Sequence, residues 1–195
     1  MKVIAATKNK GKLREMSEIL SPLGIEIVPQ EEVGIEVDVE ETGLTFEANA
    51  LIKARAVRMV SDYPVLADDS GLCVDCLGGA PGVRSARYAG DGATDSDKIN
   101  KLLSDIGDNE NRDSKFVKCV AYISEDGKEI TAHGEVKGHI THAPHGVGGF
   151  GYDPVFYSTE LKKTLAEGSE EEKNSVSHRS RALKNLYDKL NKTEV

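Results

Sequence analysis

Segments with the pattern of β-strands, one of them (33–39) strictly alternating between apolar and charged residues from residue 35 on, are interspersed along this chain with segments that have the pattern of amphipathic helices. The strand patterns occupy residues 2–6, 25–29, 33–39, 65–67, 72–77, 115–124 and 129–137. The last two flank Glu125-Asp126-Gly127, a sequence typical of a tight turn, so we expect them to form a hairpin. Strands interspersed with helices place the chain in the α/β class, as a mixed β-sheet flanked by helices.

Apolar residues recur at helical spacing in four stretches of the chain. Their members are Leu13, Met16, Ile19 and Leu20; Phe46, Ala50, Ala54 and Val57; Ile99, Leu102 and Leu103; and Leu183, Leu186 and Leu190. Thr45 is a suitable N-cap for the second helix, and the third follows Thr94. Either Ser175 or Ser177 is expected to cap the last one.

Composition limits the classes of protein to which the chain can belong. With 195 residues, 38% hydrophobic and 30% charged, it has the length and balance of one globular domain. A formal net charge of -8 argues against a surface that binds nucleic-acid phosphate. No apolar run reaches membrane-spanning length, and the apolar part of the N-terminal segment is too short for a signal peptide. We therefore expect a cytoplasmic protein without membrane or nucleic-acid partners.

Cys73 and Cys76 are spaced like a redox or zinc-binding pair. The flanking pattern predicts an extended segment, and residues i and i+3 of a strand point to opposite faces. A redox pair would lie at a helix N-terminus, and structural zinc would need four ligands. We therefore expect both cysteines to be reduced and structural.

Residues 7–12 read Thr-Lys-Asn-Lys-Gly-Lys and lie between the first expected strand and the first expected helix. The free backbone N–H groups and the dipole of a helix N-terminus favour an anion, whereas three lysines there are unfavourable for the bare helix. A phosphate bound among the lysines would explain them. A solvated basic turn remains the alternative for this segment taken alone.

Two acidic pairs follow strand patterns, Glu40-Glu41 before Thr42-Gly43 and Asp68-Asp69 before Ser70-Gly71. Asp, Ser and Gly are ordinary turn residues, so a solvated turn is one interpretation. The other is a cation site at the carboxyl end of a strand, where open α/β sheets bind ligands. Mg²⁺ is held by one or two carboxylates together with substrate phosphates. In this second interpretation the cation lies between Asp68, Asp69, Glu41 and the phosphates.

Seven motifs, in order and spread over most of the chain, resemble those of the inosine/xanthosine triphosphate pyrophosphatase family. They are Thr7–Lys12, Glu41–Phe46, Ala67–Leu72, Gly79–Val83, Ser85–Tyr88, Gly149–Pro154 and Ser177–Arg179. Each motif alone is weak, but seven in register are specific. The resemblance implies an elongated mixed sheet flanked by helices, with two lobes around a central substrate cleft, in a single domain spanning residues 1–195.

The resemblance also implies roles for particular residues. Asp69 and Lys12 would be catalytic, Asp69 as the general base toward water, and Glu41 and Asp69 would hold Mg²⁺. The triphosphate would be bound by Thr7, Lys8, Asn9, Lys10, Gly11 and Lys12, with Ser70 also contacting substrate. The purine pocket would consist of Phe150, Gly151, Tyr152, Asp153, Lys173, His178 and Arg179, with Phe150 stacking on the base.

The function implied is hydrolysis of non-standard purine nucleoside triphosphates (ITP, dITP and XTP) to the monophosphate and pyrophosphate. The enzyme would be a magnesium-dependent homodimer that clears these compounds from the nucleotide pool. Two alternatives remain: a related pyrophosphatase for modified pyrimidine nucleotides, and a nucleotide-binding regulator that has lost turnover. The acidic pairs and Lys12 disfavour the regulator, and Ser177-His178-Arg179 disfavours the pyrimidine enzyme.

Overall fold

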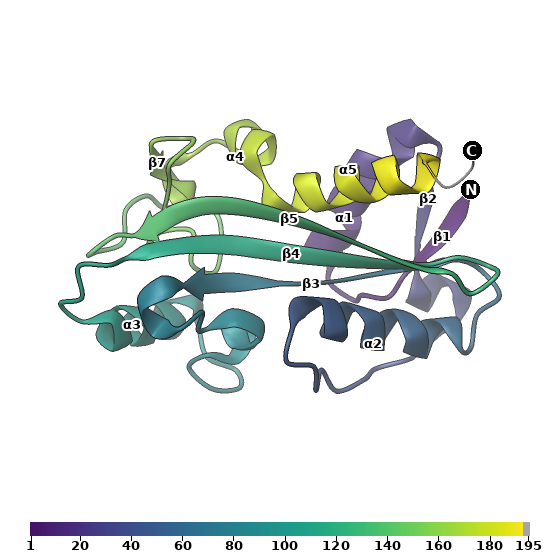
Figure 1. Ribbon diagram of the computed structural model, residues 1–195, viewed down its shortest axis with the longest axis horizontal. Coiled ribbons are helices and arrows are strands. Elements are labelled where there is room, and N and C mark those ends of the chain that lie inside the picture. Colours follow the sequence, from purple (N-terminus) through teal and green to yellow (C-terminus); the bar gives the residue numbers. More distant parts are fainter. Residues whose placement is uncertain (193–195) are drawn as a thin grey trace. The chain divides into compact units, whose positions relative to one another are not determined.

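The computed structural model describes residues 1–192 and contains a seven-stranded mixed β-sheet in the order β2-β1-β3-β4-β5-β6-β7 (Figure 1). The strands are β1 (Lys2–Ala5), β2 (Glu26–Pro29), β3 (Val65–Val74), β4 (Asp113–Ile123), β5 (Glu129–Ile140), β6 (Phe156–Ser158) and β7 (Lys163–Thr164). Strand β1 pairs in parallel with β2 and β3, whereas β6 is antiparallel to β5 and β7. The predicted mixed α/β sheet is confirmed.

Within residues 1–192, five α-helices accompany the sheet. They are α1 (Lys10–Leu20), α2 (Phe46–Arg58), α3 (Asp95–Ile106), α4 (Glu170–Val176) and α5 (His178–Asn191). The side chains of Thr45 and Thr94 accept hydrogen bonds from the first turns of α2 and α3, as predicted. Ser175 lies inside α4, so of the two candidates only Ser177 directly precedes α5. In the part of the chain that the structure describes, no helix has the length and apolar character needed to cross a membrane.

Two strand predictions were wrong. Residues 65–67 and 72–77 were expected as separate strands, but one strand, β3, runs through the acidic pair without a turn. Residues 33–39 form no strand; a 3₁₀ turn at Gln30–Val33 precedes an irregular segment. The alternating pattern of this segment has another cause. Ile35 and Val37 pack against the core, whereas Glu36 and Asp38 are exposed.

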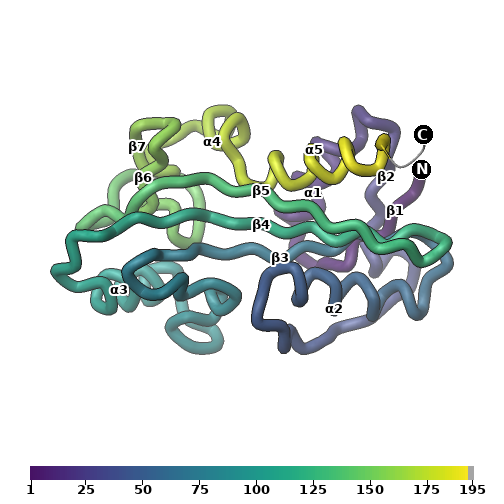
Figure 2. Tube along the Cα trace, in the orientation of Figure 1, coloured from purple at the N-terminus to yellow at the C-terminus, as the bar shows by residue number. Residues whose placement is uncertain are grey.

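The chain divides into two compact units. Unit 1 comprises residues 1–69, 118–134 and 179–195, and unit 2 comprises residues 70–117 and 135–178. Within unit 1, Figure 2 traces the path from β1 through α1 into β2, the usual connection between parallel strands.

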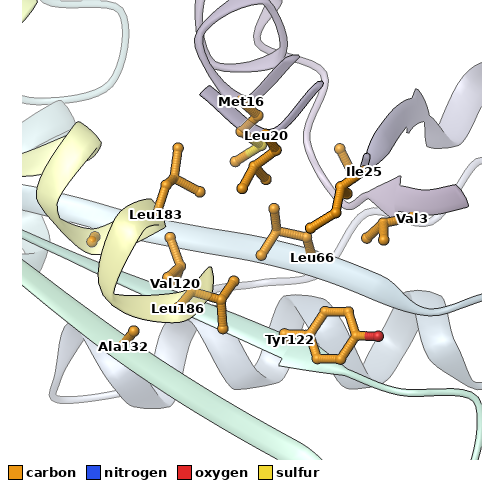
Figure 3. Close-up of a cluster of buried hydrophobic side chains, with 12 residues drawn as sticks. Val3, Met16, Leu20, Ile25, Leu66, Val120, Tyr122, Ala132, Leu183 and Leu186 are labelled. Atoms are coloured by element: carbon orange, nitrogen blue, oxygen red, sulfur yellow. The ribbon is translucent and has the colours of Figure 1, made fainter. Parts of the chain in front are cut away.

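Unit 1 has an apolar core on each face of its strands. One cluster joins the strands to α1 and α5 through Met16, Leu20, Leu183 and Leu186 (Figure 3). The other joins them to α2 through residues such as Ala50, Ala54 and Val57. Successive side chains of a strand point to opposite faces, so Leu66 belongs to the first cluster and its two neighbours belong to the second. The same alternation determines where the polar residues of these strands point.

Unit 2 has its own core, which includes Leu102 of α3, Val176 of α4 and Phe156 of β6. The rings of Phe116 and Phe156 lie 4.7 Å apart in this core. Strands β6 and β7 were not predicted, because they are three and two residues long and therefore too short to show a periodic pattern.

Candidate active site

The predicted phosphate loop, residues 7–12, connects β1 to α1 in unit 1. Asn9 is the N-cap of α1, and its side-chain oxygen accepts a hydrogen bond of 3.1 Å from the backbone N–H of Lys12. The backbone N–H of Asn9 donates to Thr7 Oγ1 at 3.2 Å. The first turn of α1 has no acidic residue. A positive helix end and three lysines therefore lie together, as the sequence predicted, which is the arrangement that favours an anion.

Asp68 and Asp69 lie inside β3 and point to opposite faces of it. The Asp68 side chain is fully buried, and that of Asp69 is 9% exposed. Because adjacent strand residues alternate, Asp68 is on the face of α1 and α5 and Asp69 is on the face of α2. The interpretation of the pair as a solvated turn is wrong. The same alternation directs the two carboxylates to opposite faces of β3, which disfavours a cation shared between them.

Lysines neutralise Asp68 instead. Its Oδ2 lies 2.9 Å from Lys12 Nζ and 3.3 Å from Lys118 Nζ, and Lys118 is itself fully buried. Burial alone would raise the pKa of Asp68, but the two lysines outweigh burial and hold that pKa well below its usual range. Burial would likewise lower the pKa of Lys12, yet Asp68 leaves it above its usual value. Asp68 is therefore an ionised group that holds Lys12 at the end of the phosphate loop.

Asp69 and Glu41 converge on one ammonium group. Lys53 Nζ lies 2.5 Å from Glu41 Oε1 and 3.9 Å from Asp69 Oδ1. Two carboxylates that both approach a single positive charge are also arranged to share a divalent cation, whose ligands would be hard oxygens. The predicted metal ligands Glu41 and Asp69 therefore fit a divalent cation that prefers oxygen ligands.

Asn49 fixes the orientation of Asp69. Its side-chain N–H donates to Asp69 Oδ2 at 3.0 Å, and its side-chain oxygen accepts from the backbone N–H of Gly43 at 2.7 Å. The side-chain amide of Asn49 thus links Gly43, two residues after Glu41, to the carboxylate of Asp69 in β3. A methyl group at Gly43 would come within 2.6 Å of Asn49 Oδ1, so this close approach requires glycine.

Sequence reasoning missed three polar residues of this site: Asn49, Lys53 and Lys118. Asn49 and Lys53 are one helical turn apart in α2, beside the buried Ala50 and Ala54, and this spacing was the available signal. Lys118 gave no comparable signal, because a lysine within a strand pattern is usually exposed.

A pocket of about 200 Å³ in unit 1 is lined by three of the predicted phosphate residues and by Glu41, one of the two predicted metal ligands, whereas Asp69 is not among its lining residues. Its polar lining includes Thr7, Lys8, Lys12, Glu41 and Lys53. The pocket therefore joins the lysines of the phosphate loop to a predicted metal ligand.

The residues expected to bind the purine are, with one exception, in unit 2. Phe150 is 61% exposed, whereas Tyr152 is buried and donates a hydrogen bond from its hydroxyl to Ser85 O at 2.9 Å. Asp153 Oδ2 accepts from the backbone N–H of Phe150 at 3.2 Å, which tightens this loop. The backbone N–H of Gly151 donates to Asp95 at 2.6 Å.

The remaining predicted purine-binding residues lie around α4 and α5. Lys173 Nζ pairs with Glu170 at 2.5 Å, and the buried His178 ring stacks on Phe116 with 5.2 Å between ring centres. Arg179 is the exception, since it belongs to unit 1 and lies 3.7 Å from Glu15 of α1. Ser70 is half-buried in β3. Their roles toward substrate stay predictions.

The Ham1 family matches residues 3–189 of the chain. The chain is 49% identical over 193 residues to a dITP/XTP pyrophosphatase of Photorhabdus laumondii, a comparison that covers 97% of this chain and 98% of that protein. It is 48% identical to the dITP/XTP pyrophosphatase of Escherichia coli K12, with the same coverage of both chains.

Two solved structures share the fold over nearly their whole length. A Ham1 protein from Staphylococcus aureus has a TM-score of 0.92 at 38% identity, covering 99% of this chain and 100% of that one. A Ham1 protein from Coxiella burnetii has a TM-score of 0.92 at 42% identity, covering 98% and 99%.

Proposed function

The chain belongs to the Ham1 family, and on that basis we propose that it hydrolyses the non-standard purine nucleoside triphosphates ITP, dITP and XTP to the monophosphate and pyrophosphate. Relatives that bear the name dITP/XTP pyrophosphatase support this substrate class. The observation that carries the proposal is the pocket of unit 1, whose lining includes Lys8, Lys12 and Glu41. The lysines would bind the negatively charged triphosphate, and the carboxylates of Glu41 and Asp69 would take part in its hydrolysis.

The phosphate loop would bind the triphosphate. Backbone N–H groups at the start of α1 offer hydrogen bonds to phosphate oxygens, and Lys8, Lys10 and Lys12 offer positive charge. Lys12 is restrained by Asp68, so its ammonium group is positioned before substrate arrives.

Glu41 and Asp69 would hold Mg²⁺, which when bound neutralises phosphate charge and favours departure of pyrophosphate. The ammonium group of Lys53 lies 2.5 Å from Glu41 Oε1 and 3.9 Å from Asp69 Oδ1 and so draws the two carboxylates toward one another. Asn49 and Lys53 together set the direction in which the Asp69 carboxylate points.

Asp69 would act as the general base. It would take a proton from the attacking water as a new bond forms between that oxygen and phosphorus, and the bond between the α- and β-phosphates breaks. Pyrophosphate leaves with the electron pair of that bond. General-base assistance of this kind is worth about 10²–10⁴ in rate.

The purine would be selected by hydrogen-bond donors. Hypoxanthine and xanthine carry an oxygen at C6, which accepts hydrogen bonds from the donors Lys173, His178 and Arg179. Adenine has an amino group at C6, which is itself a donor. It would face a donor of the protein, and both groups would be buried without an acceptor. Sites that recognise a substrate through such hydrogen bonds favour it over an analogue that cannot form them by roughly 10⁴ or more in kcat/KM. The exposed ring of Phe150 would stack on the base.

The test is a product analysis with purified protein, Mg²⁺ and ITP. We expect inosine monophosphate and pyrophosphate in equal amounts, with no inosine diphosphate. Release of orthophosphate and inosine diphosphate would contradict the proposal. Tight ITP binding without any product would favour the regulator, and turnover confined to modified pyrimidine nucleotides would favour the other alternative.

We further propose that both units serve this one activity, in the cytoplasm and as a homodimer. The three cysteines, Cys73, Cys76 and Cys119, are free thiols, which agrees with a reducing compartment. Light scattering coupled to size-exclusion chromatography would test the dimer.

A further inference from the structure

Three potential metal ligands meet on the α2 side of the strands in unit 1, and the proposed reaction uses none of them. They are Glu47 in the first turn of α2, Cys119 on β4 and His133 on β5. Their ligand atoms all lie within 4.8 Å of one another. His133 Nε2 is 2.8 Å from Glu47 Oε2 and 3.9 Å from Cys119 Sγ.

Two of these separations, 2.8 and 3.9 Å, lie on either side of those in a tetrahedral metal site. Zinc binds sulfur at about 2.3 Å and nitrogen or oxygen at about 2.0–2.2 Å, so its ligands are roughly 3.3–3.6 Å apart. A cation at the centre would open the contact between His133 and Glu47 slightly and draw the thiol inward slightly. Shifts of about half an ångström are within the reach of side-chain torsions.

We propose that Glu47, Cys119 and His133 bind one zinc-like divalent transition-metal ion, with water in the fourth position. Thiolate and imidazole ligands favour such ions, whereas Mg²⁺ requires oxygen ligands. The site is thus chemically distinct from the one formed by Glu41 and Asp69.

The surroundings of the three side chains suit a binding site open to solvent. Cys119 is fully buried and forms the floor, while the side chains of Glu47 and His133 are 45% and 51% exposed. The Thr131 hydroxyl donates to Glu47 Oε2 at 3.2 Å and so orients this ligand. Burial, assisted by the charge of Glu47, raises the pKa of the Cys119 thiol to about 12, so metal binding must release a proton.

A metal ion at this position would link three elements. Glu47 lies in the first turn of α2, the helix that carries Asn49 and Lys53, and the other two ligands belong to neighbouring strands. Because the ion binds the folded chain, it should raise the melting temperature as its concentration rises.

Cobalt(II) provides the first test, because a cobalt–thiolate bond gives a charge-transfer absorption that oxygen and nitrogen ligands do not. Metal-free protein in excess Mg²⁺ is titrated with Co²⁺, and one equivalent is expected to saturate the band. Cys119→Ser should abolish the band, and His133→Ala should weaken Co²⁺ binding about 100-fold or more, because even residues that only support a ligand contribute 10–100-fold.

The matched controls are Cys73→Ser and Cys76→Ser, which remove the other free thiols and should leave the band unchanged. His133 is largely exposed, so His133→Ala should fold even if Cys119→Ser does not. The proposal is overturned if the native protein gives no thiolate band, if the band survives His133→Ala at unchanged affinity, or if it is lost with Cys73 or Cys76. None of these readings depends on nucleotide hydrolysis.

Discussion

Asp68 and Asp69 are adjacent in the sequence but have different chemical surroundings. Asp68 pairs with Lys12 and Lys118, whereas Asp69 accepts from Asn49 and approaches Lys53. Equivalent substitutions at the two positions should therefore affect different properties of the protein.

We predict that Asp69→Asn folds normally and loses most of its turnover. The amide has the same shape as the carboxylate, but it cannot accept a proton and binds Mg²⁺ weakly. The expected loss in kcat is about 10²–10⁴-fold or more. Turnover within about tenfold of the native enzyme would mean that another group is the base.

Asp68→Asn is predicted to lose stability. It leaves the fully buried Lys118 without its counter-charge, and breaking a buried pair from one side costs about 3–5 kcal/mol. Urea denaturation measures this loss. Asp38→Asn is the control, because that side chain is 83% exposed and its pairing with Lys8 contributes little. Equal stability of the two variants would contradict the role assigned to Asp68.

The depressed pKa of Asp68 also predicts a pH dependence. Its contribution to the free energy of unfolding is complete above the unfolded-state pKa of about 3.9 and is lost as pH falls below that value. Native protein should therefore lose stability on acidification below pH 4 more steeply than Asp68→Asn does. Parallel curves for the two proteins would contradict this.

At the scale of elements, the segment before α2 is packed tightly against the first turn of that helix. A Cβ at Gly43 would meet Asn49 Oδ1 at 2.6 Å and Ala48 Cβ at 2.8 Å. We predict that Gly43→Ala displaces Asn49, lowers stability by about 1–3 kcal/mol and reduces turnover. The neighbouring Leu44 is 93% exposed, so Leu44→Ala should change neither. Normal stability and turnover in Gly43→Ala would show that the segment can move without effect.

Sequence periodicity predicted the long elements and failed at particular short or unusual ones. The helices α1, α2, α3 and α5 each present an apolar stripe, which is why their positions were predictable. Strand β3 was divided in two because Asp68 to Gly71 has turn composition. Lysines and Asn49 from other segments make the two buried carboxylates tolerable there. The segment 33–39 shows alternation without any strand partner.

The site was partly predictable for a similar reason. The phosphate loop lies at one strand-to-helix junction, and its position follows from local pattern alone. Lys53 and Lys118 meet the acidic residues only through tertiary packing, so their partners could not be read from sequence spacing.

For the whole molecule, charge is the property that the reaction must overcome. The formal net charge is -8, and a nucleoside triphosphate is also strongly anionic. In the proposed mechanism, Mg²⁺ held by Glu41 and Asp69 would reduce this repulsion. We predict that EDTA abolishes activity and that Glu41→Gln raises the Mg²⁺ concentration required for half-maximal rate. An unchanged requirement in Glu41→Gln would place the metal elsewhere.

Selection of the purine base can be measured by comparing substrates that differ at C6. That measurement is kcat/KM for pyrophosphate release from ITP, XTP and dITP, compared with ATP, under identical Mg²⁺. The account predicts that the three substrates with an oxygen at C6 exceed ATP by roughly 10⁴ or more. Ratios within the 10–200-fold that shape alone provides in an apolar pocket would contradict it.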